Sequence, residues 1–195
     1  MDATVADDLL ASLNPAQRQA VETTEGPLLV LAGPGSGKTR VITHRIAYLV
    51  RERGVPPWSI LAVTFTNRAA REMLSRLQTL LPGRADQLTV GTFHNFCVRV
   101  LRRDGHYVGV DRGFVIYDDE EQLTLIRKAL ETLNLDEKRF PPRALLGQIS
   151  AAKSELRGPR EYAEFVGRHW EEVVLRVYRI YQELLEANQA LDFDD

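Results

Sequence analysis

The residues with the clearest chemical potential form one glycine-rich stretch, Ala32-Gly33-Pro34-Gly35-Ser36-Gly37-Lys38-Thr39. It follows the phosphate-binding loop pattern except at its first position, where Ala32 replaces a glycine. Glycines let backbone N–H groups turn toward phosphate oxygens, and a helix that begins at the end of the loop adds its dipole. In such loops the lysine pairs with the β- and γ-phosphates, and the threonine hydroxyl binds Mg²⁺. The stretch therefore predicts a nucleoside triphosphate site with Mg²⁺ on Thr39, the alternative being an ordinary glycine-rich turn.

The elements that must position this loop follow from the apolar pattern. Apolar runs bounded by turn residues predict strands over 28–32, 60–65 and 88–93. Between them, helical periodicity predicts a helix over 39–53 and a second helix capped by Asn67. Alternating strands and helices are typical of an α/β fold with a parallel sheet.

After about residue 112 the alternation stops. One short strand is expected over 114–117, followed by helices over 119–133, 142–153 and 161–188, the first of them capped by Asp118-Asp119. The net charge also changes, from +4 over residues 1–113 to −6 over residues 114–195. We therefore expect an α/β part over 1–113 and a mostly helical subdomain over 114–190.

Composition excludes several classes of protein. The chain has 195 residues, 44% of them hydrophobic and 27% charged, as in ordinary globular proteins rather than disordered or fibrous ones. The sequence contains no run of about 18 apolar residues, so it predicts no membrane span. Its acidic start does not resemble a secretory signal. A single cysteine favours a reducing, cytoplasmic location. Between residues 40 and 112 there are 12 arginines and no lysine, which is typical of a surface that binds a polyanion; solvated helix faces are an equally open alternative at this point.

Further polar and aromatic residues fall at the predicted strand ends, where α/β sheets bind ligands. They are Thr64, Phe65, Thr66 and Asn67 after the second strand, and Thr92, Phe93 and His94 after the third. Each phenylalanine could stack on a nucleic acid base or pack in the core, and His94 could be structural. Ahead of the first strand, the Gln17 amide could pair with adenine N6 and N7, or simply belong to a surface helix capped by Asn14.

Taken together, LNPAQ, AGPGSGKT, AVTFTNRAAREM and GTFHNFC resemble superfamily I DNA helicases of the UvrD, PcrA and Rep type. The segments 149–153 and 191–195 are similar to that family as well. The resemblance implies an incomplete RecA-like phosphate-loop NTPase domain with a helical insertion, residues 191–195 beginning the return to the RecA-like part. It also implies ATP and Mg²⁺ as cofactors, and 3′→5′ unwinding in repair or replication.

The same resemblance implies roles for individual residues. Gln17 would read adenine, Gly33 to Thr39 would hold the triphosphate, and Arg40 would pack on the adenine face. Thr64 to Asn67 and Thr92 to His94 would grip single-stranded DNA, with Phe65 stacking on a base. The helical insertion would approach duplex DNA at the single-strand/duplex junction, with basic contacts from Lys153, Arg157 and Arg160.

The family also uses a downstream Asp-Glu pair and arginines from a second RecA-like domain, which we do not find in this sequence. Since an arginine finger is worth about 10³–10⁵ in rate, we expect the chain alone neither to hydrolyse ATP efficiently nor to unwind DNA. Two alternatives stay open at this point: a stand-alone nucleotide- or DNA-binding module without turnover, and a small phosphate-loop kinase.

Overall fold

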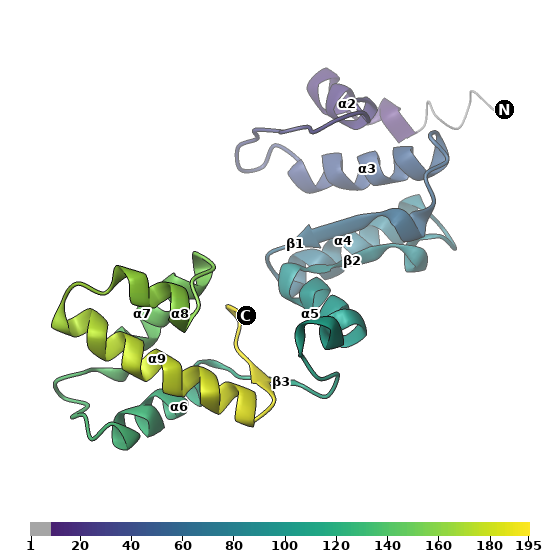
Figure 1. Ribbon diagram of the computed structural model, residues 1–195. Coiled ribbons are helices and arrows are strands. Elements are labelled where there is room, and N and C mark those ends of the chain that lie inside the picture. Colours follow the sequence, from purple (N-terminus) through teal and green to yellow (C-terminus); the bar gives the residue numbers. More distant parts are fainter. Residues whose placement is uncertain (1–8) are drawn as a thin grey trace. The chain divides into compact units, whose positions relative to one another are not determined.

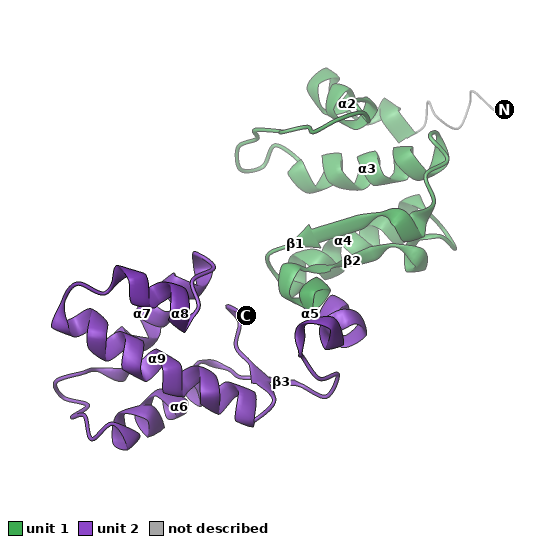
Figure 2. Cartoon of the chain, viewed as in Figure 1, with its two compact units in different colours: residues 1–97 green, residues 98–195 purple. Residues whose placement is uncertain are grey.

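The computed structural model describes residues 9–195, so the acidic start at positions 1–8 lies outside the described residues. The chain divides into two compact units, residues 1–97 and 98–195 (Figure 2). The division falls inside helix α5 (Phe93–Asp104), earlier than the boundary at 113 that the charge distribution predicts. The expected domain ranges therefore stay a prediction. None of the helices in the described residues is long and apolar enough to cross a membrane.

The first unit contains two parallel strands, β1 (Leu61–Thr64) and β2 (Thr89–Thr92). Helix α4 (Asn67–Leu80) connects them and packs on both (Figure 1). Parallel strands need such a crossover, because the chain must return to the end at which the first strand began. The pairing confirms the expected parallel arrangement for the second and third predicted strands. Short 3₁₀ turns precede each strand, at Pro57–Ser59 and Ala85–Gln87.

The first unit also contains helices α2 (Pro15–Glu22) and α3 (Lys38–Arg51). Helix α3 contacts both α2 and α4, so it links the glycine-rich loop to the strand pair. The core consists of small and branched apolar side chains from these elements, chiefly Leu9, Ile46, Ala47, Val50, Ala62, Met73, Leu77 and Leu81. A smaller cluster joins α2 to α3 through Leu10, Ala20, Val21 and Val41.

The strand expected over 28–32 is not formed, and that prediction is wrong for this structure. The segment is extended but unpaired, and Leu29 and Leu31 are 82% and 88% exposed. A strand needs a hydrogen-bonded neighbour, and in the described part of the chain β1 and β2 pair only with each other. The apolar run favours a strand by its composition, but among the described residues the segment has no partner with which to pair.

The second unit is mainly helical, as expected. Its helices are α6 (Asp119–Thr132), α7 (Pro142–Ser154), α8 (Pro159–Tyr162) and α9 (His169–Ala187), with 3₁₀ turns at Gly105–Val108 and Ala163–Phe165. Their buried faces form one core that includes Ile126, Leu130, Leu145, Ile149, Val174, Val177, Tyr178, Tyr181 and Leu185. Strand β3 (Val115–Ile116) pairs in parallel with β4 (Ala190–Leu191), a partner that sequence periodicity did not predict (Figure 1).

Helix starts differ from expectation in two places. The helix expected over 161–188 is interrupted before α9, because the Glu171 carboxylate accepts hydrogen bonds from the backbone N–H groups of Gly167 and Arg168. Those bonds cap a new helix start and also lower the pKa of Glu171. At α4 the capping residue is Thr66 rather than Asn67. Asp118 caps α6 as predicted.

Candidate nucleotide and DNA site

The glycine-rich loop forms a tight turn that ends at the start of α3. The Ser36 hydroxyl donates to the Gly33 carbonyl at 2.7 Å, closing the turn. Gly37 has φ +82°, a left-handed conformation that residues with a Cβ rarely adopt. A Cβ added to Gly37 would lie 2.9 Å from the Nε2 atom of Gln17. Gly37 is therefore fixed both by backbone conformation and by the close approach of the Gln17 side chain.

Lys38 is the first residue of α3, and its ammonium group turns back onto the loop. Its Nζ donates to the carbonyl oxygens of Ala32 at 3.2 Å and Gly33 at 2.8 Å. An ammonium group has three hydrogens, so one donor is left for an incoming anion. Thr39 follows it in the first turn of α3, where the helix dipole also favours negative charge. These are the groups that a magnesium-bound triphosphate requires.

Gln17 has two protein partners and retains half of its hydrogen-bonding capacity. Its side-chain oxygen accepts from the backbone N–H of Asn14 at 3.1 Å, completing a capping box at the start of α2. Its Nε2 donates to the carbonyl of Ser36 at 3.0 Å. A carboxamide can accept twice and donate twice, so one acceptor position and one donor hydrogen remain. Adenine offers the complementary pair at N6 and N7.

A cavity of about 610 Å³ lies between these groups. Its wall includes Gln17, Ser36, Lys38, Val41 and Arg45, and its two charged residues are both cations. Ala32 and Gly33 also line this cavity. Pro34, Gly35, Gly37 and Thr39 belong to the same loop and helix start but do not line it. Arg40 is exposed and borders a separate hollow beside Thr43 and Arg76, so its stacking on adenine stays a prediction.

The two aromatic segments meet at one edge of the strand pair. Thr64 and Thr92 are register partners at the C-terminal ends of β1 and β2, so the residues that follow them are neighbours. The ring centroids of Phe65 and Phe93 are 5.4 Å apart. Phe65 is 91% exposed and Phe93 is 48% exposed, which excludes core packing for Phe65. The structure therefore brings these two predicted residues together on an open surface.

The polar residues of this edge organise its backbone. Thr66 accepts from the N–H of Ala69, and the Asn95 amide donates to the Oδ1 atom of Asn67 at 3.4 Å. Thr92 is only 7% exposed, and its hydroxyl accepts from the N–H of Asn95 at 3.2 Å. Thr92 thus fits a structural role at the start of α5 better than a contact with DNA. Asn95 was not among the predicted residues, although it lies one position beyond them.

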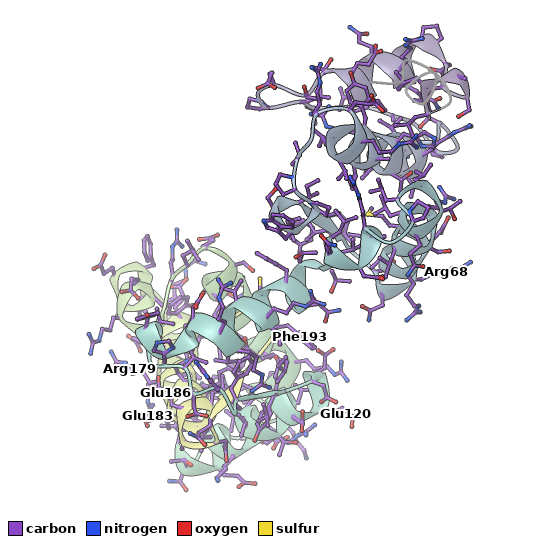
Figure 3. The ribbon with its side chains drawn as sticks, turned by 90° about the vertical axis from the view of Figure 1, so that its right-hand side faces the viewer. Arg68, Glu120, Arg179, Glu183, Glu186 and Phe193 are labelled. Carbon is purple, nitrogen blue, oxygen red and sulfur yellow. The ribbon has the colours of Figure 1, made fainter. Side chains whose placement is uncertain are left out.

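Charge on this part of the chain is basic and exposed. Arg68 stands at the start of α4, directly after the aromatic edge, and projects away from the ribbon (Figure 3). Arg71 follows one turn later and is also exposed. In the second unit, Glu120 of α6 and Glu183 and Glu186 of α9 are exposed together with Arg179, so the exposed charge there is mixed (Figure 3). The basic surface therefore accompanies the aromatic edge.

One of the three basic contacts expected in the helical insertion is wrong. Lys153 is 8% exposed, and its Nζ lies 2.7 Å from the Oδ2 atom of Asp192 and 2.7 Å from the Oδ1 atom of Asp195. The ammonium is thus neutralised inside the unit and cannot reach DNA. Arg157 is half-buried, stacked over the Phe165 ring and paired with Glu155. Arg160 is exposed, so it keeps its predicted role.

The glycine-rich loop and the helix that begins with Lys38 and Thr39 are features of the phosphate-loop class, although the strand that precedes such a loop is not formed here. The comparison with protein families makes this specific. The UvrD/REP helicase N-terminal domain matches residues 13–195, and the chain belongs to this family.

Relatives that are named as helicases agree with this family assignment. The chain is 53% identical over 191 residues to the ATP-dependent DNA helicase PcrA of Bacillus subtilis. It is 49% identical over 187 residues to PcrA of Staphylococcus aureus and 48% identical to PcrA of Staphylococcus epidermidis. These alignments cover 96–98% of this chain but only 26% of each relative. The chain thus spans about a quarter of the length of the helicases it matches.

Proposed function

We propose that this chain is the N-terminal, ATP- and DNA-binding part of an ATP-dependent 3′→5′ DNA helicase that acts in repair or replication. The single observation that carries the proposal is the exposed Phe65–Phe93 pair, because it lies in the same unit as the glycine-rich loop and Gln17. A base-stacking surface beside a triphosphate site is what a motor tracking single-stranded DNA needs. The relatives named as DNA helicases support the same reading.

In the proposed nucleotide site, each group has a separate task. Backbone N–H groups of Gly33 to Gly37 would surround the phosphates, Lys38 would pair with them, and the Thr39 hydroxyl would hold Mg²⁺. Bound Mg²⁺ would neutralise charge on the phosphates. Gln17 would read the base with its remaining donor and acceptor. We further propose that β1 and β2 belong to a RecA-like sheet, with α4 as the crossover helix between them.

In the proposed DNA site, the aromatic pair supplies stacking and the arginines supply charge. Successive bases of a single strand would stack on Phe65 and Phe93, and Arg68 would contact the phosphate backbone. Thr64, Thr66, Asn67 and His94 would line the same path. Single-stranded DNA and single-strand/duplex junctions are the proposed partners. A stand-alone binding module and a small kinase gain no support from relatives that are named helicases.

The DNA site is tested by Phe65→Ala. We expect the affinity for single-stranded DNA to fall by about 5- to 100-fold, since base stacking on an aromatic ring contributes roughly 1–3 kcal/mol. The melting temperature should change little, because a ring that is 91% exposed contributes little to the core. Fluorescence anisotropy with a labelled oligonucleotide and thermal melting measure the two effects.

Trp58→Ala is the matched control for that variant. Trp58 is 71% exposed and precedes β1, so it lies toward the opposite end of that strand from Phe65. We expect it to leave DNA affinity unchanged. Equal losses of DNA affinity in the two variants would indicate that exposed aromatic rings bind DNA nonspecifically. A large drop in the melting temperature of Phe65→Ala would indicate that the ring packs in the core, which would contradict its role in stacking.

A further inference from the structure

Arg45 connects the helix that carries Gln17 to the helix that carries Lys38. It lies on α3 two turns after Lys38 and one turn after Val41, so the three residues share one face of the helix. Its Nη1 atom donates to the carbonyl oxygen of Ala20 at 2.6 Å and to that of Thr23. Ala20 is in the last turn of α2, and Thr23 caps that helix. One side chain thus ties the C-terminal end of α2 to α3.

The charge of Arg45 suits this position. The last carbonyls of a helix lack partners within the helix and carry partial negative charge. Helix α2 has no basic residue of its own in its last turn, so Arg45 supplies the cation from α3. Arg45 also lines the cavity that Gln17 and Lys38 line. Its guanidinium donates hydrogen bonds to the end of α2, whereas the ammonium of Lys38 donates to the loop.

Helix α2 is short, and side-chain hydrogen bonds join each of its ends to a neighbouring segment. Gln17 attaches its first turn to the loop through Ser36, and Arg45 attaches its last turn to α3. The apolar contacts between the two helices come from a small cluster, including Ala20, Val21 and Val41. Apolar contacts are non-directional, whereas hydrogen bonds at the end of a helix help to fix its position along the axis. A misplacement of about 1 Å is enough to weaken a hydrogen-bonded site.

We propose that Arg45 is a positioning residue for base selection: it holds α2 so that the remaining donor and acceptor of Gln17 face the nucleotide base. The inference rests on the proposed nucleotide site. Guanine presents acceptors at both O6 and N7, so the donor–acceptor pair of Gln17 favours adenine only while its position is fixed. Loss of Arg45 relaxes this preference and leaves the binding of phosphates intact.

The test compares ATP, GTP and inorganic tripolyphosphate as ligands of the full chain, by calorimetry in the presence of Mg²⁺. Wild type should bind ATP about tenfold more tightly than GTP, the effect of one lost pairing. Arg45→Met should bring the ATP-to-GTP ratio to about one, as Gln17→Ala does, with tripolyphosphate affinity unchanged. In the double variant, Arg45→Met should add nothing to Gln17→Ala, because Arg45 acts through Gln17.

Two further variants complete the experiment. Arg45→Lys should restore most of the preference, since an ammonium group can also donate to both carbonyls. Arg18→Met removes an exposed arginine of α2 that is paired with Glu22 on the same helix, and it should leave the ratio unchanged. An equal loss of ATP and tripolyphosphate binding in Arg45→Met would overturn the inference. A wild-type chain that binds neither ligand would instead overturn the proposed nucleotide site itself.

Discussion

Lys153→Met is expected to lower the free energy of unfolding of the second unit by about 3–5 kcal/mol, the usual effect of removing one partner from a buried ion pair. The side chains of Lys153 and Asp192 are 6% and 1% exposed. Methionine fills similar volume but leaves the carboxylates of Asp192 and Asp195 without their cation. Tyr181 still donates to Asp192 at 2.8 Å, but a hydroxyl cannot neutralise the charge.

The loss of stability in the second unit can be measured within the full chain by a fluorescent reporter in that unit. The chain has two tryptophans, so a Trp58→Phe background leaves Trp170, which packs on the core of the second unit, as the reporter. Urea unfolding followed by its fluorescence gives the difference in free energy. Lys128→Met is the matched control, because Lys128 is exposed on α6. Adding Asp192→Asn to Lys153→Met should recover part of the loss, and a purely additive double variant would contradict the charge argument.

The loss of stability caused by Lys153→Met is also expected to depend on pH. Burial alone would raise the pKa of Asp192, but the hydrogen bond and charge of Lys153 hold it below its ordinary 3.8. A lowered pKa stabilises the folded state above about pH 4, and this contribution is lost as the pH falls through the lowered value. In Lys153→Met, only the hydrogen bonds from Tyr181 and the backbone still oppose burial, so we expect the pKa of Asp192 to rise and acidification to relieve the penalty. We therefore expect the two proteins to differ most near pH 7 and to converge toward about pH 4. If the free energies of unfolding of the two proteins differed by the same amount at every pH, the carboxylates would be excluded as the cause of the difference.

Lys38→Ala is expected to weaken ATP binding by about 10- to 100-fold, since a hydrogen bond between charged groups contributes roughly 1.5–3 kcal/mol. Its ammonium is exposed, and the carbonyls of Ala32 and Gly33 can be hydrated once it is removed. Stability should therefore change little. Calorimetry with ATP and Mg²⁺ measures the affinity, and melting checks the fold. Lys138→Ala, at an exposed position of the second unit, is the control. Unchanged ATP affinity in Lys38→Ala would remove the loop from the proposed site.

Local sequence signals predicted the elements well where the cause was local. Asp118 and Asn14 act as helix caps because a cap depends on residues only three positions away. The parallel pairing of β1 and β2 followed from the alternation of strands and helices. The meeting of Thr64 and Thr92 at one edge then follows from the geometry of parallel strands.

Burial and contacts that depend on residues far apart in the sequence could not be predicted from local patterns. Lysines usually lie on the surface, so the residue type of Lys153 indicated an exposed cation. Its partners Asp192 and Asp195 lie about forty positions further along the chain, and no local pattern predicts that pairing. Whether Phe65 is core or surface depends on which elements cover that edge, so the sequence alone left both open. Arg45 could have been noticed, because it continues the face of α3 that carries Val41, but its carbonyl partners on α2 carry no side-chain signature.

We expect the uncovered segment 28–31 to promote self-association of the chain at high concentration. These residues are uncharged, exposed and extended, and they include no proline, as in segments that associate edge to edge. Leu28, Val30 and Leu31 also line the cavity beside Lys38. Self-association through this segment would therefore cover the proposed nucleotide site. The fraction of chains able to bind ATP should fall as the sample is concentrated, so dilute samples give the truer affinity.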